Sequence, residues 1–137
     1  MSQENLDLIH EMHEAFLRRD AETANQLLAD DIEWDTTRIA ETVPDLAGVY
    51  RGAEQSRDLW RAWLSPWRKL EMEYELRDSG DDVVSLIREQ RQWGRYSGVV
   101  TDIQPYAWVY TLREGKVVRG CWYPDHRSGL AAIGLAE

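Results

Sequence analysis

The chain has 137 residues, which is enough for one domain with a single core and one ligand-sized pocket, but not for two independent lobes. Its 25 acidic and 16 basic side chains give a net charge of −9, which would repel a nucleic-acid backbone or an anionic lipid surface. Nucleic-acid binding is therefore disfavoured, and since no apolar run approaches the roughly 20 residues that span a bilayer, no membrane association is expected.

The N-terminal part predicts two helices before any strand. Residues 4–18 place apolar side chains at helical spacing, and Asp20 is a plausible N-cap for a second, short helix that stops before Asp30. Residues 32–36 then alternate like a half-buried strand. The segment 38–48 contains Pro and Gly and predicts a loop over the end of this strand, which could act as a lid.

A third helix and a series of hairpins follow. Residues 53–64 predict a helix that ends at Ser65, because proline at the next position disfavours helix in the residue before it. The apolar period then changes to two, which predicts strands over 69–77, 83–93, 99–112 and 117–123. Four strands in hairpin order indicate an antiparallel meander, closed by a short helical tail over 125–135. No repeat or linker interrupts the chain, so we expect a single domain over 1–137.

This order of elements resembles the nuclear transport factor 2-like superfamily. Six fragments are similar to its SnoaL-like branch, which contains relatives of ketosteroid isomerases and polyketide cyclases. They are residues 28–34 (LADDIEW), 50–52 (YRG), 94–98 (GRYSG), 111–118 (TLREGKVV), 122–125 (WYPD) and 129–135. The resemblance implies an α+β fold, a cone-shaped α+β barrel in which a strongly bent antiparallel sheet carries about three helices over its concave face. It also implies a homodimer, but no particular activity, since the superfamily includes several enzyme classes and members that only bind.

The catalytic residues of the ketosteroid isomerases are not matched in this sequence. The resemblance places their first-helix tyrosine at Met12, their proton-moving aspartate at Thr36, and their oxyanion aspartate at Trp108 or Ala107. A shift of one residue would restore Asp35 as the proton carrier.

The catalytic set of the epoxide hydrolases is matched only in part. Their Arg-x-Asp triplet falls on Arg88-Glu89-Gln90, and their last-strand aspartate falls on Trp122. The amide of Gln90 does not titrate and cannot act as a base. The acidic residue of the SnoaL-type cyclases has no match here, but their chemistry needs only one proton-transfer group and a shaped apolar cavity, so a cyclase stays open.

Strand alternation assigns one set of side chains to a common cavity wall, roofed by residues of the first and third helices. The predicted ligand-binding set is Met12, Trp34, Thr36, Trp60, Trp63, Leu86, Arg88, Gln90, Tyr106, Trp108 and Trp122. Arg88 is the sharpest candidate, because a cation on an apolar face needs an acidic partner or an anionic ligand group. A structural ion pair would explain it equally well, and packing against the sheet would explain Trp60 and Trp63.

The catalytic candidates are Asp35, His13 and Arg88. His13 lies on the apolar stripe of the first helix, where a core histidine is the usual outcome and a general base is the alternative. Asp35 would cap or pair at a strand end, or carry a proton. The three histidines are scattered and there is one cysteine, so no metal-ligand spacing exists. We expect no metal and no cofactor.

Seven Trp and six Tyr against one Phe suit a cavity wall that is apolar and can also form hydrogen bonds. We therefore expect a protein that binds a small apolar molecule, cyclic or aromatic, with a carbonyl or anionic group near Arg88 and Gln90. It would be a binder or a cofactor-independent isomerase, cyclase or dehydratase. The alternatives are a dimerisation or protein-interaction module with a filled cavity, and a subunit of an oxygenase. The lone Cys121 and the absence of a signal-peptide pattern in 1–5 predict a cytoplasmic protein.

Overall fold

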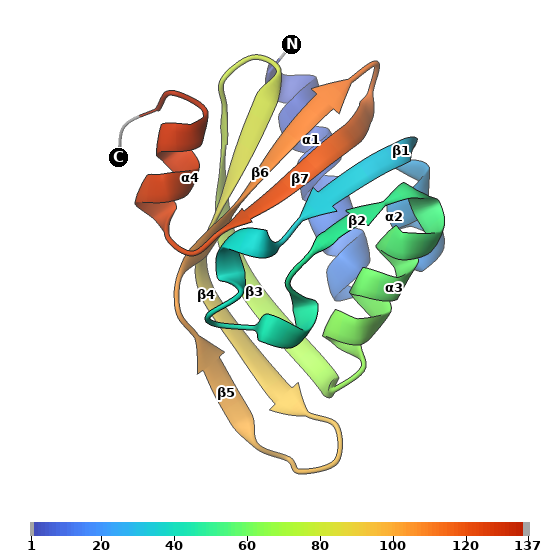
Figure 1. Ribbon diagram of the computed structural model, residues 1–137, viewed down its shortest axis with the longest axis vertical. Helices are drawn as coiled ribbons and strands as arrows, with labels where there is room; N and C mark the ends of the chain where they lie inside the picture. The colour runs from blue at the N-terminus through green and yellow to red at the C-terminus, as the bar shows by residue number, and fades with distance from the viewer. Residues whose placement is uncertain (1, 136–137) are drawn as a thin grey trace.

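The computed structural model describes residues 2–135 and consists of helices packed against a curved seven-stranded sheet (Figure 1). The helices are α1 (Ser2–Leu17), α2 (Ala21–Gln26), α3 (Gly52–Leu64) and α4 (His126–Ala132), with two 3-10 turns, η1 (Thr37–Ile39) and η2 (Pro44–Leu46). The strands are β1 (Leu28–Asp35), β2 (Val49–Arg51), β3 (Trp67–Asp78), β4 (Asp82–Gly94), β5 (Val100–Ile103), β6 (Tyr106–Arg113) and β7 (Lys116–Tyr123).

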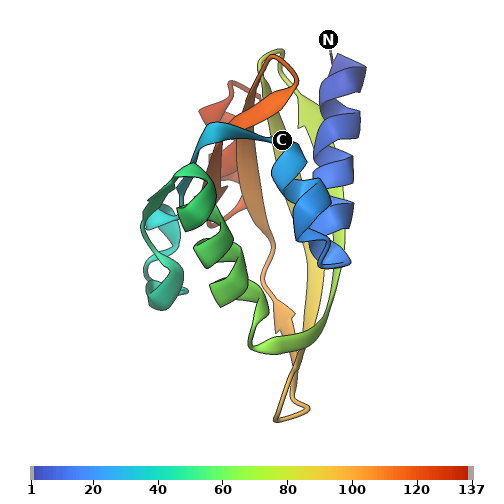
Figure 2. The ribbon, with the colours of Figure 1, turned by 90° about the vertical axis from the view of Figure 1, so that its right-hand side faces the viewer.

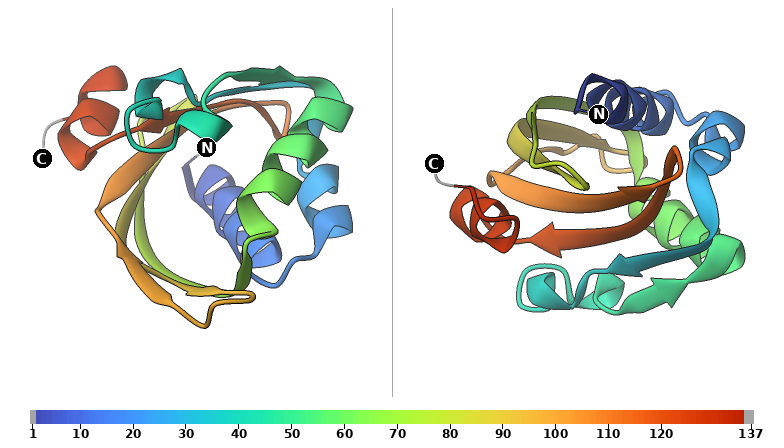
Figure 3. Two further views of the ribbon diagram at one scale, coloured as in Figure 1. Left: turned by 60° about the horizontal axis from the view of Figure 1, so that its bottom comes forward. Right: turned by 90° about the horizontal axis from the view of Figure 1, so that it is seen from above.

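The sheet has the order β2-β1-β7-β6-β4-β3, and β5 pairs with β4. It is strongly bent, as predicted, but it does not close into a barrel (Figure 3). It is also mixed rather than wholly antiparallel, because β7 returns beside β1 in the same direction. Helices α1, α2 and α3 lie over the concave side and α4 lies against the opposite face (Figures 2 and 3).

The predicted strand over 99–112 is two strands in the structure. Pro105 has no N–H to donate to a ladder, and the chain leaves the sheet at this point before it resumes as β6. Both pieces pair with β4: β5 lies along Gln90–Trp93 and β6 along Asp82–Ile87. Between these two sections β4 carries a β-bulge, where the register to β3 shifts.

Local signals set most other element ends. The Asp20 side chain accepts a hydrogen bond from the Thr23 N–H at 3.1 Å, which caps α2 as predicted. The predicted loop 38–48 contains the two 3-10 turns, and α3 ends at Leu64, directly before Ser65. The first strand starts at Leu28, four residues earlier than predicted, because α2 is only six residues long.

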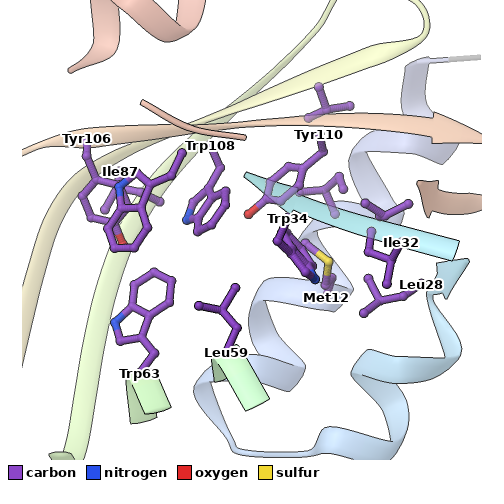
Figure 4. Packing of buried hydrophobic residues seen from close by; sticks show 14 of the residues in the cluster. Met12, Leu28, Ile32, Trp34, Leu59, Trp63, Ile87, Tyr106, Trp108 and Tyr110 are labelled. Carbon is purple, nitrogen blue, oxygen red and sulfur yellow. The ribbon is translucent and has the colours of Figure 1, made fainter. Parts of the chain in front are cut away.

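The main hydrophobic core lies between the concave face and the three helices (Figure 4). Trp34 and Trp108 are at its centre and are almost completely buried. A smaller cluster on the other face of the sheet packs Val84 and Leu86 against Leu130 of α4. None of the helices within residues 2–135 has the length and apolar character needed to cross a membrane.

Candidate functional site

A pocket of about 380 Å³ lies between the helices and the concave face of the sheet, and it is called the α2–α3 pocket here. Its lining comes from α1, α2, β1, α3, β3 and β6, and from Arg95 after β4. The lining residues that are exposed to solvent, among them Ala21 of α2 and Arg61 of α3, mark its mouth. Most of the wall is aromatic or aliphatic. The aromatic lining residues are Phe16, Trp34, Trp60, Trp63, Trp108 and Tyr110.

Five of the eleven residues predicted to bind a ligand line this pocket. They are Met12, Trp34, Trp60, Trp63 and Trp108. Figure 4 shows Trp34, Trp108 and Tyr110 projecting from the strands into the interior and Trp63 facing them from α3. Their convergence is a consequence of strand alternation on a bent sheet, which brings side chains from separate strands together. Whether any of them binds a ligand stays a prediction.

Trp34 is one of the residues lining the pocket, but neighbouring rings cover its surface almost completely. Its ring makes edge-to-face contacts with Trp60 at 4.8 Å and Trp108 at 5.5 Å between centroids, and its indole N–H donates to Ser56 Oγ at 2.8 Å. Gly120 of β7 pairs with Trp34 across the ladder. A β-carbon on Gly120 would lie 2.3 Å from Trp34 Cζ3, so the absence of a side chain at this position leaves the space that the indole occupies.

Three further predicted residues, Trp122, Tyr106 and Gln90, are buried inside the cone but do not line the pocket. Trp122 stacks on Trp63 with centroids 4.5 Å apart, and Tyr106 packs against Trp122 at 5.1 Å. The side chain of Gln90 accepts a hydrogen bond from the Tyr106 hydroxyl and donates to Gln92 Oε1 at 2.6 Å. The aromatic rings therefore fill this part of the cone, and the side chains of Gln90 and Tyr106 have partners inside it. Gln90 also lines a second pocket, of about 400 Å³, together with Arg88.

The prediction that Leu86 and Arg88 face the cavity is wrong. Leu86 belongs to the small cluster under α4, and Arg88 is exposed and forms an ion pair with Glu75. The cause is the β-bulge in β4: Glu73 pairs with Glu89 and Tyr74 with Ile87, which leaves Arg88 as the additional residue. The bulge resets the alternation, so that Gln90 points inward although Arg88 does not.

Thr36 is fully buried, as a cavity residue would be, but it lies outside the α2–α3 pocket. Its hydroxyl donates to the Leu46 carbonyl oxygen at 2.6 Å and accepts from the Gly48 N–H at 2.9 Å. Thr36 therefore does not contribute to the wall of this pocket, and its hydroxyl holds the end of the 38–48 loop against β1.

Thr36→Val should lower the free energy of unfolding by about 1 kcal/mol, because valine has the same shape but leaves the half-buried Gly48 N–H without a partner and the Leu46 carbonyl oxygen with the Tyr50 hydroxyl alone. Urea denaturation would measure the change. Thr36→Ser, which keeps the hydroxyl, is the control and should cost clearly less. Equal losses in the two variants would contradict this account.

Asp35 lies on the other side of β1 from Trp34 and does not reach the pocket. Its carboxylate pairs with Arg38 at 3.2 Å and Arg119 at 3.6 Å and accepts from the Thr37 N–H at 3.0 Å. Partial burial opposes ionisation, but the hydrogen bonds from Thr37 and the charge of Arg38 outweigh it and lower the pKa of Asp35. Asp35 is thus a paired surface carboxylate, and the structure does not place it as a proton carrier for this pocket.

His13 is the one catalytic candidate that lines the pocket. Its Nε2 lies 3.3 Å from the Tyr110 hydroxyl, and its ring packs 4.5 Å from that of Tyr74. Burial, with a smaller contribution from the nearby His10, lowers the pKa of His13 to about 3, so the imidazole is neutral at pH 7. Burial also raises the pKa of the Tyr110 hydroxyl. The base of the pocket therefore carries two neutral groups that form hydrogen bonds.

Four arginines were not among the predicted site residues. Arg19, Arg57, Arg61 and Arg95 all line the α2–α3 pocket and are exposed. Arg57 and Arg61 stand four residues apart on α3 and flank Trp60, a spacing that could have revealed them. No signal in the sequence links Arg19 and Arg95, which only the fold brings together. Within residues 2–135, no group of three or more His, Cys, Asp or Glu could hold a metal ion.

Solved structures share this arrangement over almost the whole chain. A nuclear transport factor 2-like protein of unknown function from Burkholderia pseudomallei is 22% identical, with a TM-score of 0.76, over 98% of this chain and 99% of that chain. TerC, co-crystallised with polyporic acid, is 19% identical, with a TM-score of 0.74, over 95% and 98%. A protein with a ketosteroid isomerase-like fold from Catenulispora acidiphila, in complex with trimethylamine, is 16% identical, with a TM-score of 0.69, over 93% and 92%.

These identities establish the fold alone. No curated protein is similar enough to count as a match. The family model described as the SnoaL-like domain, however, matches residues 9–120, which is most of the chain. Together with the bent sheet and its three covering helices, this match shows that the chain belongs to the SnoaL-like domain family.

Proposed function

We propose that this protein binds one small, largely apolar molecule, cyclic or aromatic, in the α2–α3 pocket. The observation that carries the proposal is an open space of about 380 Å³ walled by aromatic rings, because small-molecule sites are concave, mostly apolar and about 300–1,000 Å³ in volume. TerC was co-crystallised with polyporic acid and the Catenulispora protein is in complex with trimethylamine, so proteins of this fold have been solved with small molecules.

The base of the pocket favours a ligand with a carbonyl or hydroxyl group at its inner end. The Tyr110 hydroxyl and the neutral His13 imidazole are the polar groups at this depth. Each can donate or accept one hydrogen bond, and a buried polar group of the ligand needs such a partner.

Catalysis, if the bound molecule reacts, would depend mainly on positioning. A histidine whose pKa is about 3 is a weak base at neutral pH, and Asp35 and Arg88 lie outside the pocket. The chemistry that fits is a cofactor-independent isomerisation, cyclisation or dehydration in which the cavity holds the substrate in a reactive shape and Tyr110 donates to a carbonyl oxygen.

Ala24→Phe should abolish the binding of N-phenyl-1-naphthylamine, a neutral aromatic dye that fluoresces on entering an apolar site. Ala24 lines the pocket from α2 and is only half-buried, so a phenyl ring can enter the pocket without displacing the core. Fluorescence titration would measure the dissociation constant, and circular dichroism would check the fold.

Ala62→Phe is the matched control, since Ala62 is exposed on α3 and does not line the pocket. It should leave dye binding unchanged. The proposal would be wrong if the wild-type protein bound no neutral aromatic dye, or if the two phenylalanine variants bound it equally well.

A second candidate function is a non-catalytic dimerisation or protein-interaction module. The stack of Trp63, Trp122 and Tyr106 fills part of the cone, and Tyr96, Val99 and Val100 are exposed on the β4–β5 hairpin. Analytical ultracentrifugation that finds a homodimer, together with no dye binding, would favour this candidate over the first.

A further inference from the structure

We infer that the α2–α3 pocket selects apolar molecules that carry an anionic group, such as aromatic carboxylic acids, and that Arg57 and Arg61 at its mouth bind this group. This inference rests on the proposed function and names the chemical class of the ligand. It also moves the expected anion contact from Arg88 to a different part of the fold.

The charge at the mouth is opposite to that of the whole chain. Four arginines line the pocket, and Asp20 is the single acidic residue in the lining. The chain overall has 25 acidic against 16 basic side chains. A positive rim beside low-dielectric walls focuses the electric field into the opening and raises the local concentration of anions. An apolar pocket for neutral ligands would not need this concentration of cations.

Two of these arginines, Arg19 and Arg95, already donate hydrogen bonds to backbone carbonyl oxygens. Arg95 Nε donates to the Ser65 carbonyl oxygen at 2.9 Å, and Arg19 donates to the carbonyl oxygens of Leu64, at 3.4 Å, and Trp67. They satisfy carbonyl groups at the C-terminal end of α3, in the turn that follows it and at the start of β3. Their position at the rim is therefore partly explained by the fold itself.

Arg57 and Arg61 have no comparable role. Arg57 forms no hydrogen bond or ion pair with any residue in the described range 2–135, although it lines the pocket. Arg61 has one ion pair, with Asp58 at 3.5 Å, in which both side chains are largely exposed. Such a pair contributes little and can exchange for a better partner. One helical turn separates the two guanidinium groups, so they can bracket a carboxylate between them.

The groups at the base and at the mouth of the pocket differ in charge, and this difference determines where an anionic group of the ligand can lie. At the base, the His13 imidazole is neutral and the Tyr110 hydroxyl is protonated, so no cation could compensate a buried anion there. Asp20, which also lines the pocket, is ionised, since the hydrogen bonds from Thr23 lower its pKa, and its charge would repel an anion beside it. The ligand would therefore insert its apolar part toward Trp34 and Trp108 and leave its anionic group on the α3 side of the mouth.

Two dyes test this orientation. 8-Anilinonaphthalene-1-sulfonate has the same aromatic skeleton as N-phenyl-1-naphthylamine with one additional sulfonate. The wild-type protein should bind the sulfonate dye more tightly, and the Arg57→Gln/Arg61→Gln double variant should weaken that binding about fivefold to tenfold. Binding of the neutral dye should stay unchanged, and high salt should weaken only the sulfonate dye.

Arg77→Gln/Arg113→Gln is the matched control, because it also removes two positive charges, which form ion pairs with Glu75 and Asp31 and do not line the pocket. It should leave both dissociation constants unchanged, whereas Ala24→Phe should abolish binding of both dyes. The inference is overturned if the Arg57→Gln/Arg61→Gln variant binds the sulfonate dye as tightly as wild type, if it loses both dyes equally, or if the control loses as much. In those cases the proposed function still stands if the wild-type protein binds the neutral dye. If the wild-type protein binds neither dye, both proposals are rejected.

Discussion

Gly120→Ala is expected to lower the free energy of unfolding by about 3 kcal/mol, a large cost for a single methyl group. The added β-carbon would lie 2.3 and 2.4 Å from Cζ3 and Cε3 of Trp34, whose indole is fully buried and fixed by its hydrogen bond to Ser56. Because neighbouring rings enclose Trp34, the indole cannot move without displacing Trp60 or Trp108. Urea denaturation followed by circular dichroism would measure the loss.

Gly94→Ala is the control for this prediction. Its β-carbon would come equally close, 2.4 Å, to Ser97 Oγ, but that hydroxyl is at the end of an exposed side chain that can rotate away. Trp34→Leu should partly relieve the Gly120→Ala defect, so the two substitutions together should cost at least about 1 kcal/mol less than the sum of the single changes. Strict additivity would show that the Trp34 contact is not the cause.

His13 should make the protein lose stability on mild acidification. The pKa of His13 is lowered to about 3 in the folded state, against 6.5 for the unperturbed group, so below pH 6.5 the unfolded chain binds a proton that the folded chain does not. The stabilising contribution is complete above pH 6.5 and is lost as the pH falls toward 3. Between about pH 7 and about pH 5 the loss from this residue should be about 2 kcal/mol.

The measurement is the free energy of unfolding of wild type and His13→Gln at several pH values in that range. Glutamine keeps a donor and an acceptor for Tyr110 but does not titrate. Its curve should therefore be flatter than that of wild type, whatever its absolute stability. Parallel curves for wild type and His13→Gln would refute a buried neutral imidazole.

The fold was largely predictable because local sequence signals set the ends of its helices and strands. Asp20 caps α2, Ser65 precedes the proline that follows α3, and the turn between β6 and β7 has positive φ values at Glu114 (54°) and Gly115 (73°), the geometry of a type I′ hairpin turn. Each of these signals depends on one or two neighbouring residues. The parallel pairing of β1 with β7 depends instead on residues about 90 positions apart, for which the sequence offers no local signal.

The candidate site was less predictable for the same reason. One additional residue in β4 turned Arg88 outward, and a rule of strict alternation cannot show where a bulge falls. Thr36 was assigned to the cavity because the resemblance places the proton-moving aspartate of the isomerases there, but its hydroxyl has partners in a loop ten to twelve residues away. The arginine rim depends on how α2 and α3 sit over the sheet, so it became visible only in three dimensions.

The five indoles at the centre of the molecule have a consequence for how it can be observed. Trp34, Trp60, Trp63, Trp108 and Trp122 form a continuous array in which contacting rings have centroids 4.5–6.0 Å apart. At such separations the excited states of adjacent rings couple, and absorbed energy passes among them before it is emitted. A guest that perturbs one ring would therefore alter the ultraviolet emission and exciton circular dichroism of the whole array, which makes the unlabelled protein its own optical reporter.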